Sequence, residues 1–353
     1  MKSPLRNLLA MTAAGIGIIL ALPIIVVALP FWIVALLTSS IARALEPRFV
    51  TWKEIIEYYP AIGWKPRPNL DTHHLSDDVF RMTTDGEGWR GKSTVSESHI
   101  VVLGDSFAFG YGVDDKDFFA NVNPTFRIKA IGASGYNMVQ EFLWLERLSP
   151  LLQGKLVVWL IYFGNDLYEN LVPDMYGYRM PFVRQLDGTR EWEIVTSHVG
   201  PAKWPFVDTL DTVGVKYYQK LAELCGPTFL SARAYPACAY LIQKGRDICK
   251  QVGAKLVVVS IPDITQLSQS GRKRLASLAP DPETFDPELP DRKVRETCTN
   301  LGVPFVALKD HLELSDYKES DCHWNQKGHR RVAELLTVLY RQHMFQESPT
   351  SER

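Results

Sequence analysis

Residues 99–106 read HIVVLGDS, and this short segment decides the fold class that the rest of the chain must fit. The apolar, largely β-branched run at 99–103 is typical of a strand that is buried in a parallel sheet. Gly104 and Asp105 end the run with residues that favour a tight turn. The segment therefore predicts a buried strand whose carboxyl end leads directly to the hydroxyl group of Ser106.

The same pattern recurs towards the C-terminus and alternates with segments of helical periodicity. Four further strands are predicted at residues 126–131, 155–163, 254–261 and 304–308. Helices are predicted at residues 138–148, 236–252, 290–301 and 326–343. Strands that alternate with helices of this length indicate right-handed βαβ units, so we expect an α/β fold with a parallel sheet of five strands.

Two stretches do not fit this alternation. Residues 44–98 are rich in Trp, Pro and Gly, and we expect an irregular extension that packs on the core, with a helix near 52–59. Residues 167–230 hold many aromatic residues, and they predict an insertion over the carboxyl edge of the sheet. The domain expected from 99 to 343 contains this insertion and is followed by a frayed tail at 344–353.

The N-terminal segment differs in character from everything that follows it. Residues 8–37 carry no charged side chain, and these 30 residues exceed the roughly 20 that cross a bilayer as a helix. A cleaved signal peptide is the alternative, and Ala42-Arg43-Ala44 resembles a cleavage site, but the apolar core of a signal peptide has only about 7–15 residues. We therefore expect an uncleaved membrane anchor at residues 1–43.

Two features leave the path of this anchor open. Pro23 and Pro30 each remove a backbone donor, so the segment is either a kinked, tilted span or a hairpin that returns to the same side. Lys2 and Arg6 favour a cytoplasmic N-terminus only weakly, because Arg43 and other basic residues follow the segment. A single span with this orientation, which we prefer, places the domain outside the cytoplasm.

Composition excludes several classes of protein. The 39 Lys and Arg residues are balanced by 40 Asp and Glu residues, and a net charge of −1 excludes a general nucleic-acid binder. The five cysteines include no Cys-x-x-Cys pair, which argues against a zinc module or a disulfide scaffold. Outside the cytoplasm two pairings remain open, Cys225 with Cys238 and Cys298 with Cys322.

Polar residues follow the predicted strands where a parallel sheet places its sites, beyond the carboxyl ends. Ser106 follows the first strand, Gly132 the second, and Asn165 the third. Asp321 and His323 precede the last predicted helix. A hydroxyl, a glycine turn, an amide and an imidazole beside a carboxylate are the groups that nucleophilic acyl transfer requires.

In this order, the four segments resemble the blocks that define the SGNH, or GDSL-type, hydrolase superfamily. The blocks are similar to residues 100–110, 131–136, 162–166 and 321–325, within a resemblance that covers roughly 99–340. No Gly-x-Ser-x-Gly motif surrounds Ser106, which separates the chain from the α/β-hydrolases. The resemblance implies a three-layer α/β/α, flavodoxin-like fold and a serine esterase that needs no cofactor and no metal.

The resemblance also implies a role for each of these residues. Ser106 would be the nucleophile, His323 the general base, and Asp321 the carboxylate that orients the imidazole. The backbone N–H groups of Ser106 and Gly132 and the side-chain amide of Asn165 would form the oxyanion hole. The mechanism implied is a two-step route through an acyl-enzyme.

Two positions depart from the family pattern. Many relatives carry Asp three residues before the histidine, a position that is Ser320 here. Asp321 is the preferred partner of the histidine, with Asp316 and Glu319 as substitutes, and the loop geometry must then differ. Ala130 stands where an Asn often precedes the glycine of the second block, which removes a supporting hydrogen bond.

Several other residues with chemical potential are interpreted as structural. Asp105 and Asp166 are expected to brace their turns, and His329 is expected on the surface. His73-His74, with Asp77-Asp78 nearby, are expected in a solvated loop, because a metal site needs ligands that converge from a fixed frame.

Four aromatic residues of the insertion leave two interpretations open. They either line a pocket for a sugar or an acyl group or form the insertion's own small core. These residues are Tyr168, Tyr176, Tyr178 and Trp192.

Three functions fit these observations. The leading one is a membrane-anchored serine ester hydrolase that acts on an O-acyl ester of a glycan or a lipid. An O-acyltransferase would use the same acyl-enzyme with a sugar hydroxyl in place of water. A catalytically silent, glycan-binding protein is disfavoured, because it would have no chemical need for Ser106, Gly132, Asn165 and His323 together.

Overall fold

The computed structural model describes residues 48–75, 79–123, 125–175, 177–201, 210–319 and 321–345, with the side chains of 210–215 left out. The predicted membrane anchor at 1–43 lies outside the described residues, as does most of the predicted tail. Among the described residues, no helix combines the length and the apolar character that a membrane span requires.

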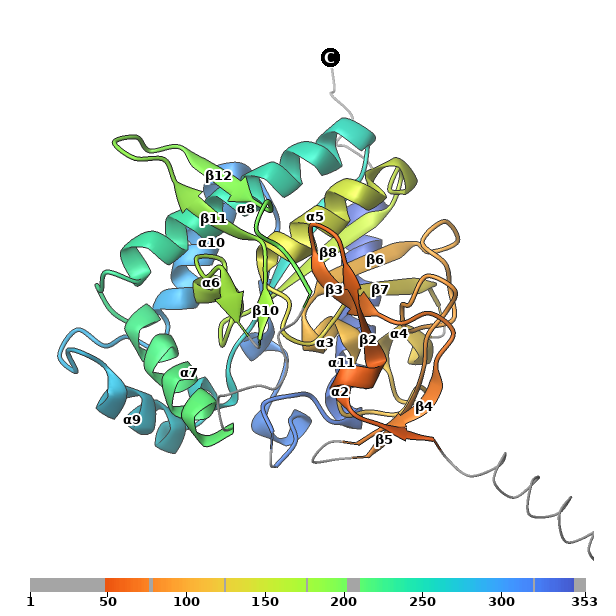
Figure 1. Ribbon diagram of the computed structural model, residues 1–353, viewed down its shortest axis with the longest axis horizontal. Helices are drawn as coiled ribbons and strands as arrows, with labels where there is room; N and C mark the ends of the chain where they lie inside the picture. The colour runs from red at the N-terminus through yellow and green to blue at the C-terminus, as the bar shows by residue number, and fades with distance from the viewer. Residues whose placement is uncertain are drawn as a thin grey trace, which may run out of the picture. The chain divides into compact units, whose positions relative to one another are not determined.

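A parallel sheet of five strands forms the centre of the fold (Figure 1). Its order from one edge to the other is β7 (Ile128–Gly132), β6 (Ile100–Gly104), β8 (Leu156–Tyr162), β13 (Lys255–Ile261) and β14 (Phe305–Ala307). All four neighbouring pairs are parallel, which confirms the predicted five-stranded parallel sheet. Within this sheet, β6 is the first strand along the chain. The next strand, β7, lies on one side of β6, and the following strand, β8, lies on the other side. The direction in which strands are added therefore reverses between β6 and β8. Ligands of such sheets bind beyond the carboxyl ends at this reversal.

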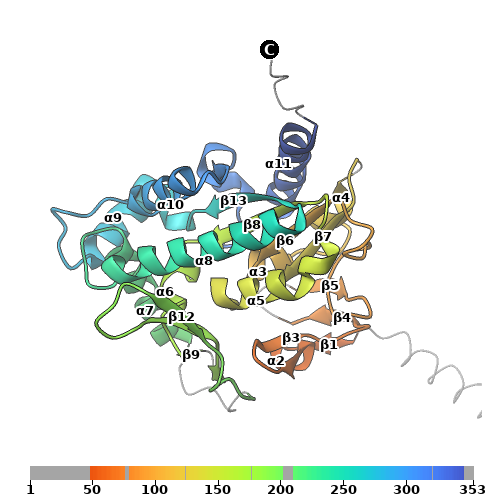
Figure 2. The same ribbon diagram turned by 90° about the horizontal axis from the view of Figure 1, so that it is seen from above.

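Helices cover both faces of the sheet and complete three layers (Figure 2). One face packs against α5 (Met138–Leu148), α8 (Ser231–Val252) and α10 (Leu289–Leu301), and the other against α4 (Phe119–Val122) and α11 (Gln326–Met344). The residues of β6 alternate between the two cores, because successive side chains of a strand point to opposite faces. The three-layer α/β expectation is therefore confirmed.

The helices end close to the predicted residues because their caps are encoded locally. Asn137 and Gln140 form a capping box at the start of α5. Gly253 ends α8 with a φ of 72°, in the left-handed region that glycine adopts without strain. The start of α8 was predicted at Pro236, and this was wrong by five residues, because the proline lies inside the helix and not at its beginning.

The extension before the sheet is more regular than predicted. It contains α2 (Trp52–Ile55), β1 (Phe49–Val50), β2 (Ile56–Tyr59), β3 (Gly63–Pro66), β4 (Asp71–His74) and β5 (Phe80–Thr83). The predicted helix at 52–59 was wrong in its second half, because the aromatic and β-branched residues of β2 pair with β3 in an antiparallel ladder. His73 and His74 belong to β4, so the predicted loop was also wrong, and His74 is buried against Phe80 with ring centroids 5.1 Å apart.

The extension is fastened to the second strand end of the sheet. The Tyr136 hydroxyl donates a hydrogen bond of 2.6 Å to the backbone oxygen of Trp64. The Gln140 side-chain amide donates one of 2.7 Å to the backbone oxygen of Ile62. These bonds place β3 beside the residues that follow β7.

The remaining elements surround the carboxyl edge. The short helix α3 (Ser106–Phe109) follows β6, and α6 (Asp166–Glu169) follows β8. Two hairpins and two helices come after α6, namely β9 (Asp174–Met175) with β10 (Tyr178–Arg179), β11 (Phe182–Gln185) with β12 (Trp192–Val195), α7 (Leu210–Leu224) and α9 (Gln269–Leu278).

All five cysteines lie within the described residues, and none is paired. Cys225, Cys238, Cys249 and Cys298 are buried thiols, and Cys322 is partly exposed. Neither of the two pairings left open by the sequence is formed.

Candidate active site

The turn after β6 presents the Ser106 hydroxyl at the reversal point of the sheet. Asp105 caps α3, because its carboxylate accepts a hydrogen bond of 2.9 Å from the backbone N–H of Phe107. Ser106 is the first residue of this helix, and Gly110 ends it with a φ of 75°. Asp105 thus braces the turn, as expected, and its side chain also accepts from the Ser106 hydroxyl at 3.3 Å.

A tight loop before α11 carries the predicted base and its partner. Tyr317 and Trp324 form an antiparallel bridge, and the Lys318 N–H donates to the His323 carbonyl at 2.9 Å. Asn325 joins this loop to α11, because its carbonyl group caps the helix while its amide group donates to the Tyr317 carbonyl at 2.8 Å. The loop therefore holds the histidine in a fixed position relative to the helix.

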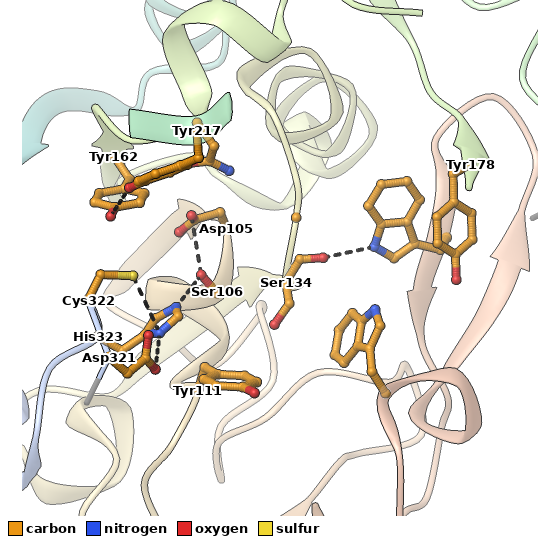
Figure 3. Close-up of a pocket in the computed structure, with 14 residues that line it drawn as sticks. Asp105, Ser106, Tyr111, Ser134, Tyr162, Tyr178, Tyr217, Asp321, Cys322 and His323 are labelled. Atoms are coloured by element: carbon orange, nitrogen blue, oxygen red, sulfur yellow. Dashed lines mark hydrogen bonds and ion pairs between the residues drawn. The ribbon is translucent and has the colours of Figure 1, made fainter. Parts of the chain in front are cut away.

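Ser106, His323 and Asp321 form a continuous hydrogen-bonded chain (Figure 3). The Ser106 Oγ lies 2.7 Å from His323 Nε2, and His323 Nδ1 lies 2.6 Å from Asp321 Oδ2. The structure thus brings together, across 217 positions of sequence, the three side chains proposed as nucleophile, base and orienting acid.

The charges of this chain of residues support one another. Burial alone would raise the pKa of Asp321, but the hydrogen bond and the charge of His323 outweigh it and lower that pKa to about 2. Burial alone would lower the pKa of His323, but its acidic neighbours Cys322 and Asp321 outweigh it and raise that pKa above its usual range. Burial also raises the pKa of the Cys322 thiol. The thiol is therefore neutral near pH 7, and the charge beside the imidazole is that of Asp321.

The two substitute acids do not reach the imidazole. Asp316 is buried and forms ion pairs with Arg331 at 2.8 Å and Lys327 at 3.1 Å, both on α11. Glu319 is exposed. Of the three acids considered, Asp321 is the one bonded to His323.

Gly132 has a packing role at the end of β7. It pairs with Gly104 at the end of β6, and a Cβ atom on it would lie 2.6 Å from the Gly104 oxygen and 2.7 Å from the Asp105 oxygen. The absence of a side chain lets β7 approach the turn that carries Ser106. The wall of the cavity beyond β7 is formed by Ser134 and Gly135.

Asn165 lies between β8 and α6 and also lines the cavity. Its amide donates a hydrogen bond of 3.2 Å to the Tyr136 carbonyl, which ties the end of β8 to the segment after β7. Asp166 braces the turn, as expected, because it accepts from the Tyr162 N–H at 2.7 Å.

Within the part of the chain that the structure describes, the backbone N–H groups of Ser106 and Gly135 donate no hydrogen bond.

These elements enclose a cavity of about 440 Å³. The catalytic residues and the aromatic side chains that surround them form its walls. The lining residues are Trp52, Trp64, Asp105, Ser106, Tyr111, Ser134, Gly135, Tyr162, Asn165, Tyr178, Tyr217, Asp321, Cys322 and His323.

The aromatic walls differ from those considered in the sequence. Of the four aromatic candidates in the insertion, Tyr178 lines the cavity and Tyr168 is buried. Trp192 lies on β12, in the hairpin that β12 forms with β11, and Tyr176 lies outside the described residues. Sequence reasoning missed five other aromatic residues that line the cavity, namely Trp52, Trp64, Tyr111, Tyr162 and Tyr217. Residue type alone could not select these five from the many aromatics of the chain, because their place depends on contacts between distant segments.

Two further histidine observations concern the same region. His329 was expected on the surface, and this was wrong: it is buried on α11, stacked on Phe119 with ring centroids 5.8 Å apart. Among the described residues, the one group of side chains compact enough for a metal is Asp321, Cys322 and His323, with ligand atoms within 4.8 Å of one another. These are residues of the hydrogen-bonded chain itself.

Arg90 holds the loop that follows α3. Its guanidinium is buried and donates to the Gly110 carbonyl at 2.6 Å and the Val113 carbonyl at 3.0 Å, while it pairs with Asp115 at 2.8 Å. The same loop carries Tyr111, whose ring centroid lies 4.8 Å from that of His323. An arginine of the extension therefore positions an aromatic wall of the cavity.

We expect Arg90→Met to lower the free energy of unfolding by about 3–5 kcal/mol, because it leaves a carboxylate and two carbonyl groups without their buried donor. Arg81→Met is the matched control, since Arg81 pairs with Asp71 at 2.9 Å on the exposed surface and should cost less than about 1 kcal/mol. Urea unfolding of both variants measures the difference. Equal losses would contradict a buried anchoring role for Arg90.

Comparisons with known proteins give limited information. No protein-family model matches the chain, and no curated protein is similar to it in sequence. A GDSL-like lipase from Bacteroides thetaiotaomicron VPI-5482 is a similar solved structure, with 13% identity, a TM-score of 0.35, and coverage of 71% of this chain and 92% of the lipase. A carbohydrate acetylesterase family member from Sinorhizobium meliloti is similar at 14% identity and a TM-score of 0.35, covering 70% of this chain and 98% of its own. Both TM-scores lie below 0.5.

Proposed function

We propose that the protein is a serine ester hydrolase that works through an acyl-enzyme. The observation that carries this proposal is the hydrogen-bonded chain from Ser106 Oγ through His323 to Asp321, with distances of 2.7 and 2.6 Å, at the wall of a cavity. A nucleophile within reach of a base, and a base held by a carboxylate, is the arrangement of covalent acyl transfer.

In the first step, Ser106 Oγ attacks the ester carbonyl carbon while its proton passes to His323 Nε2. The tetrahedral intermediate collapses when the carbon–oxygen bond to the alcohol breaks, and the imidazolium gives its proton to the leaving oxygen. In the second step, water attacks the carbonyl carbon of the acyl-enzyme and gives a proton to His323. The bond between this carbon and Ser106 Oγ then breaks, His323 returns the proton to Ser106, and the carboxylic acid leaves. Asp321 stays ionised throughout and stabilises the imidazolium.

The negative oxygen of both intermediates needs donors that are already in place. The Ser106 N–H and the Asn165 side-chain amide are proposed as two of them. Gly132 was expected to supply the third, and the Gly135 N–H is the better candidate, because Gly135 lines the cavity and Gly132 packs against the turn. Removal of one such donor costs about 3–4 kcal/mol of transition-state stabilisation in other enzymes.

The test uses the full chain in detergent with p-nitrophenyl acetate and a fluorophosphonate probe. Turnover together with covalent labelling of Ser106, both lost in His323→Ala, supports the proposal. Absence of turnover and of labelling would contradict it. Addition of an alcohol distinguishes the two fates of the acyl-enzyme, because a transferase passes the acetyl group to the alcohol in preference to water.

We also propose that residues 8–37 anchor the protein in a membrane and that the catalytic domain lies outside the cytoplasm. The length of this uncharged segment supports the anchor. We expect the chain to stay with membranes after an alkaline carbonate wash, and a reporter fused after Arg353 to be active only in its extracytoplasmic form. Deletion of 8–37 is the control and should release the chain. A carbonate-soluble full chain would contradict the anchor, and a cytoplasmically active reporter would contradict the orientation.

A further inference from the structure

Two tyrosine hydroxyls and one carboxylate form a closed hydrogen-bonded group at one wall of the cavity. Tyr162 lies at the end of β8, Tyr217 lies on α7, and Asp263 follows β13. The two hydroxyl groups contact each other, and they lie 2.6 Å (Tyr162) and 2.7 Å (Tyr217) from the same oxygen, Asp263 Oδ2. We call Tyr162, Tyr217 and Asp263 the tyrosine–aspartate group.

The protons of this group are committed to bonds within it. Three oxygen atoms contact one another, and only the two phenols bring a proton, because an ionised carboxylate accepts and does not donate. The other carboxylate oxygen of Asp263 is occupied by Thr265, which donates to it from its backbone N–H at 2.8 Å and from its hydroxyl group. The phenolic oxygens of the two cavity-lining tyrosines therefore have lone pairs, and no proton, left for a ligand.

Tyr217 is the member of the group that a ligand can reach. Both tyrosines line the cavity, but Tyr162 is buried while Tyr217 is partly exposed. The Tyr217 hydroxyl also lies against the main chain beside Asn165, since a Cβ atom on Gly164 would meet it at 1.8 Å. The Tyr217 hydroxyl is thus held at a fixed point beside the main chain that leads to Asn165.

The tyrosine–aspartate group lies on the same side of the nucleophile as the base. Figure 3 shows Tyr162, Tyr217 and His323 on one side of Ser106, and Tyr178 on the other. The Phe107 ring contacts both the tyrosine–aspartate group and the base, because its centroid lies 4.7 Å from that of Tyr162 and 4.8 Å from that of His323. Because the protonated His323 must reach the leaving oxygen, the alcohol part of the ester occupies this side.

We propose that Tyr217 determines specificity for the alcohol part of the ester by accepting a hydrogen bond from a second hydroxyl group of a polyhydroxylated alcohol. This inference rests on the proposed ester hydrolysis and narrows its substrate class to esters of polyols, either glycerol or a sugar. An alcohol without a further hydroxyl leaves the phenolic oxygen unpaired, and a site built for a hydrogen bond discriminates against a ligand that lacks its partner. Tyr162 and Asp263 are positioning residues that fix the polarity of Tyr217.

A purely structural role is the alternative, since the same bonds fasten α7 to the ends of β8 and β13. The two roles differ in what they do to substrates that share an acyl group. If the bonds only fasten α7, their loss lowers the turnover of all esters in the same proportion. Loss of an acceptor lowers only the turnover of esters whose alcohol carries a further hydroxyl.

The experiment measures kcat/KM of the full chain in detergent for four acetate esters: p-nitrophenyl acetate, propyl acetate, glycerol monoacetate and a monoacetylated methyl glucoside. We expect Tyr217→Phe to lower the ratio of glycerol or glucoside ester to propyl ester by about fivefold. The ester that loses most in Tyr217→Phe, of glycerol or of the glucoside, identifies the class of polyol. Tyr218→Phe is the matched control on the same helix. Its ring packs on Tyr217 and Arg274 and does not line the cavity, so the ratio should not move.

The results test the specificity role of Tyr217 and the proposed ester hydrolysis separately. Equal losses for all four esters in Tyr217→Phe, or an unchanged ratio, would overturn the specificity role while leaving ester hydrolysis intact. Turnover of p-nitrophenyl acetate that is absent, or that persists in Ser106→Ala, would overturn the proposed function and this inference with it.

Discussion

Ser106→Ala is expected to lower kcat/KM for p-nitrophenyl acetate by about 10⁴- to 10⁶-fold, the largest single effect in the molecule. The substitution removes the atom that bonds to the acyl group, so no acyl-enzyme forms. The remaining rate comes from the oxyanion donors and from substrate binding, which alone leave a modest acceleration over water.

The loss should not come from unfolding. Asp105 caps α3 through the Phe107 N–H at 2.9 Å, and this bond does not involve the Ser106 side chain. We therefore expect the midpoint of thermal unfolding to stay close to that of the unmodified chain. A large drop in that midpoint would show that Ser106 acts in folding and would remove the chemical meaning of the lost turnover.

Ser134→Ala is the matched control, since it removes a hydroxyl group from the opposite wall of the same cavity. The Ser134 hydroxyl is buried and has no hydrogen-bond partner among the described residues. We expect a loss of less than about tenfold in kcat/KM, because no step of the reaction passes through this oxygen. Comparable losses in the two variants would contradict the assignment of Ser106 as the nucleophile.

The sheet was predictable because its signals are local. Each buried strand is a short β-branched run, and each is followed by a turn residue or a helix cap whose preference is encoded within a few positions. Gly253 and the capping box of Asn137 and Gln140 are examples. The start of α8 was misplaced because Pro236 is locally typical of a helix start, whereas Thr228 and Ser231 exchange side-chain-to-backbone hydrogen bonds that begin the helix before it.

The proximity of the proposed catalytic residues could be predicted from the sequence, but the cavity around them could not. Ser106, Asn165, Asp321 and His323 follow strand ends or precede a helix, so parallel topology brings them to one edge. The walls come instead from the extension and the insertion, which have no repeating pattern. Tyr217 reaches the cavity because Asp263, 46 positions away, accepts its hydroxyl, and nothing near Tyr217 in sequence encodes that contact.

The family resemblance implied Gly132 as an oxyanion donor, on the argument that a side chain at this position would crowd the acyl carbon. The structure gives Gly132 a packing reason and places Gly135, three residues later, at the cavity. Two glycines in one short turn cannot be told apart until the neighbouring backbone of Gly104 is known.

Asp321→Asn is expected to lower kcat/KM by about 10³- to 10⁴-fold and, in addition, to move the pH dependence of the remaining activity. An amide at this position can donate to His323 Nδ1, which leaves the imidazole proton on Nε2. In that tautomer Nε2 cannot accept the Ser106 proton. The geometry is kept, but the base faces the nucleophile with the wrong protonation.

The direction of the pH shift follows from the pKa of His323. The base must be neutral, so activity is present above the pKa of His323 and is lost as the pH falls through it. Burial lowers that pKa, and the acidic neighbours, chiefly the charge of Asp321 near neutral pH, raise it above the usual histidine range. With Asn at 321 the charge is gone while burial remains, so the acidic limb of kcat/KM should move to lower pH.

Glu319→Gln is the matched control for this shift, because it removes one negative charge from the same loop at an exposed position. Its effect on the acidic limb should be small, since exposed charges are screened by water and salt. The measurement is kcat/KM for p-nitrophenyl acetate from acidic to alkaline pH for all three proteins, because the raised pKa of His323 places the limb of the unmodified chain above the usual histidine range. A limb that stays in place in Asp321→Asn, or that moves equally in Glu319→Gln, would show that the contact of 2.6 Å between Asp321 and His323 does not set the protonation of the base.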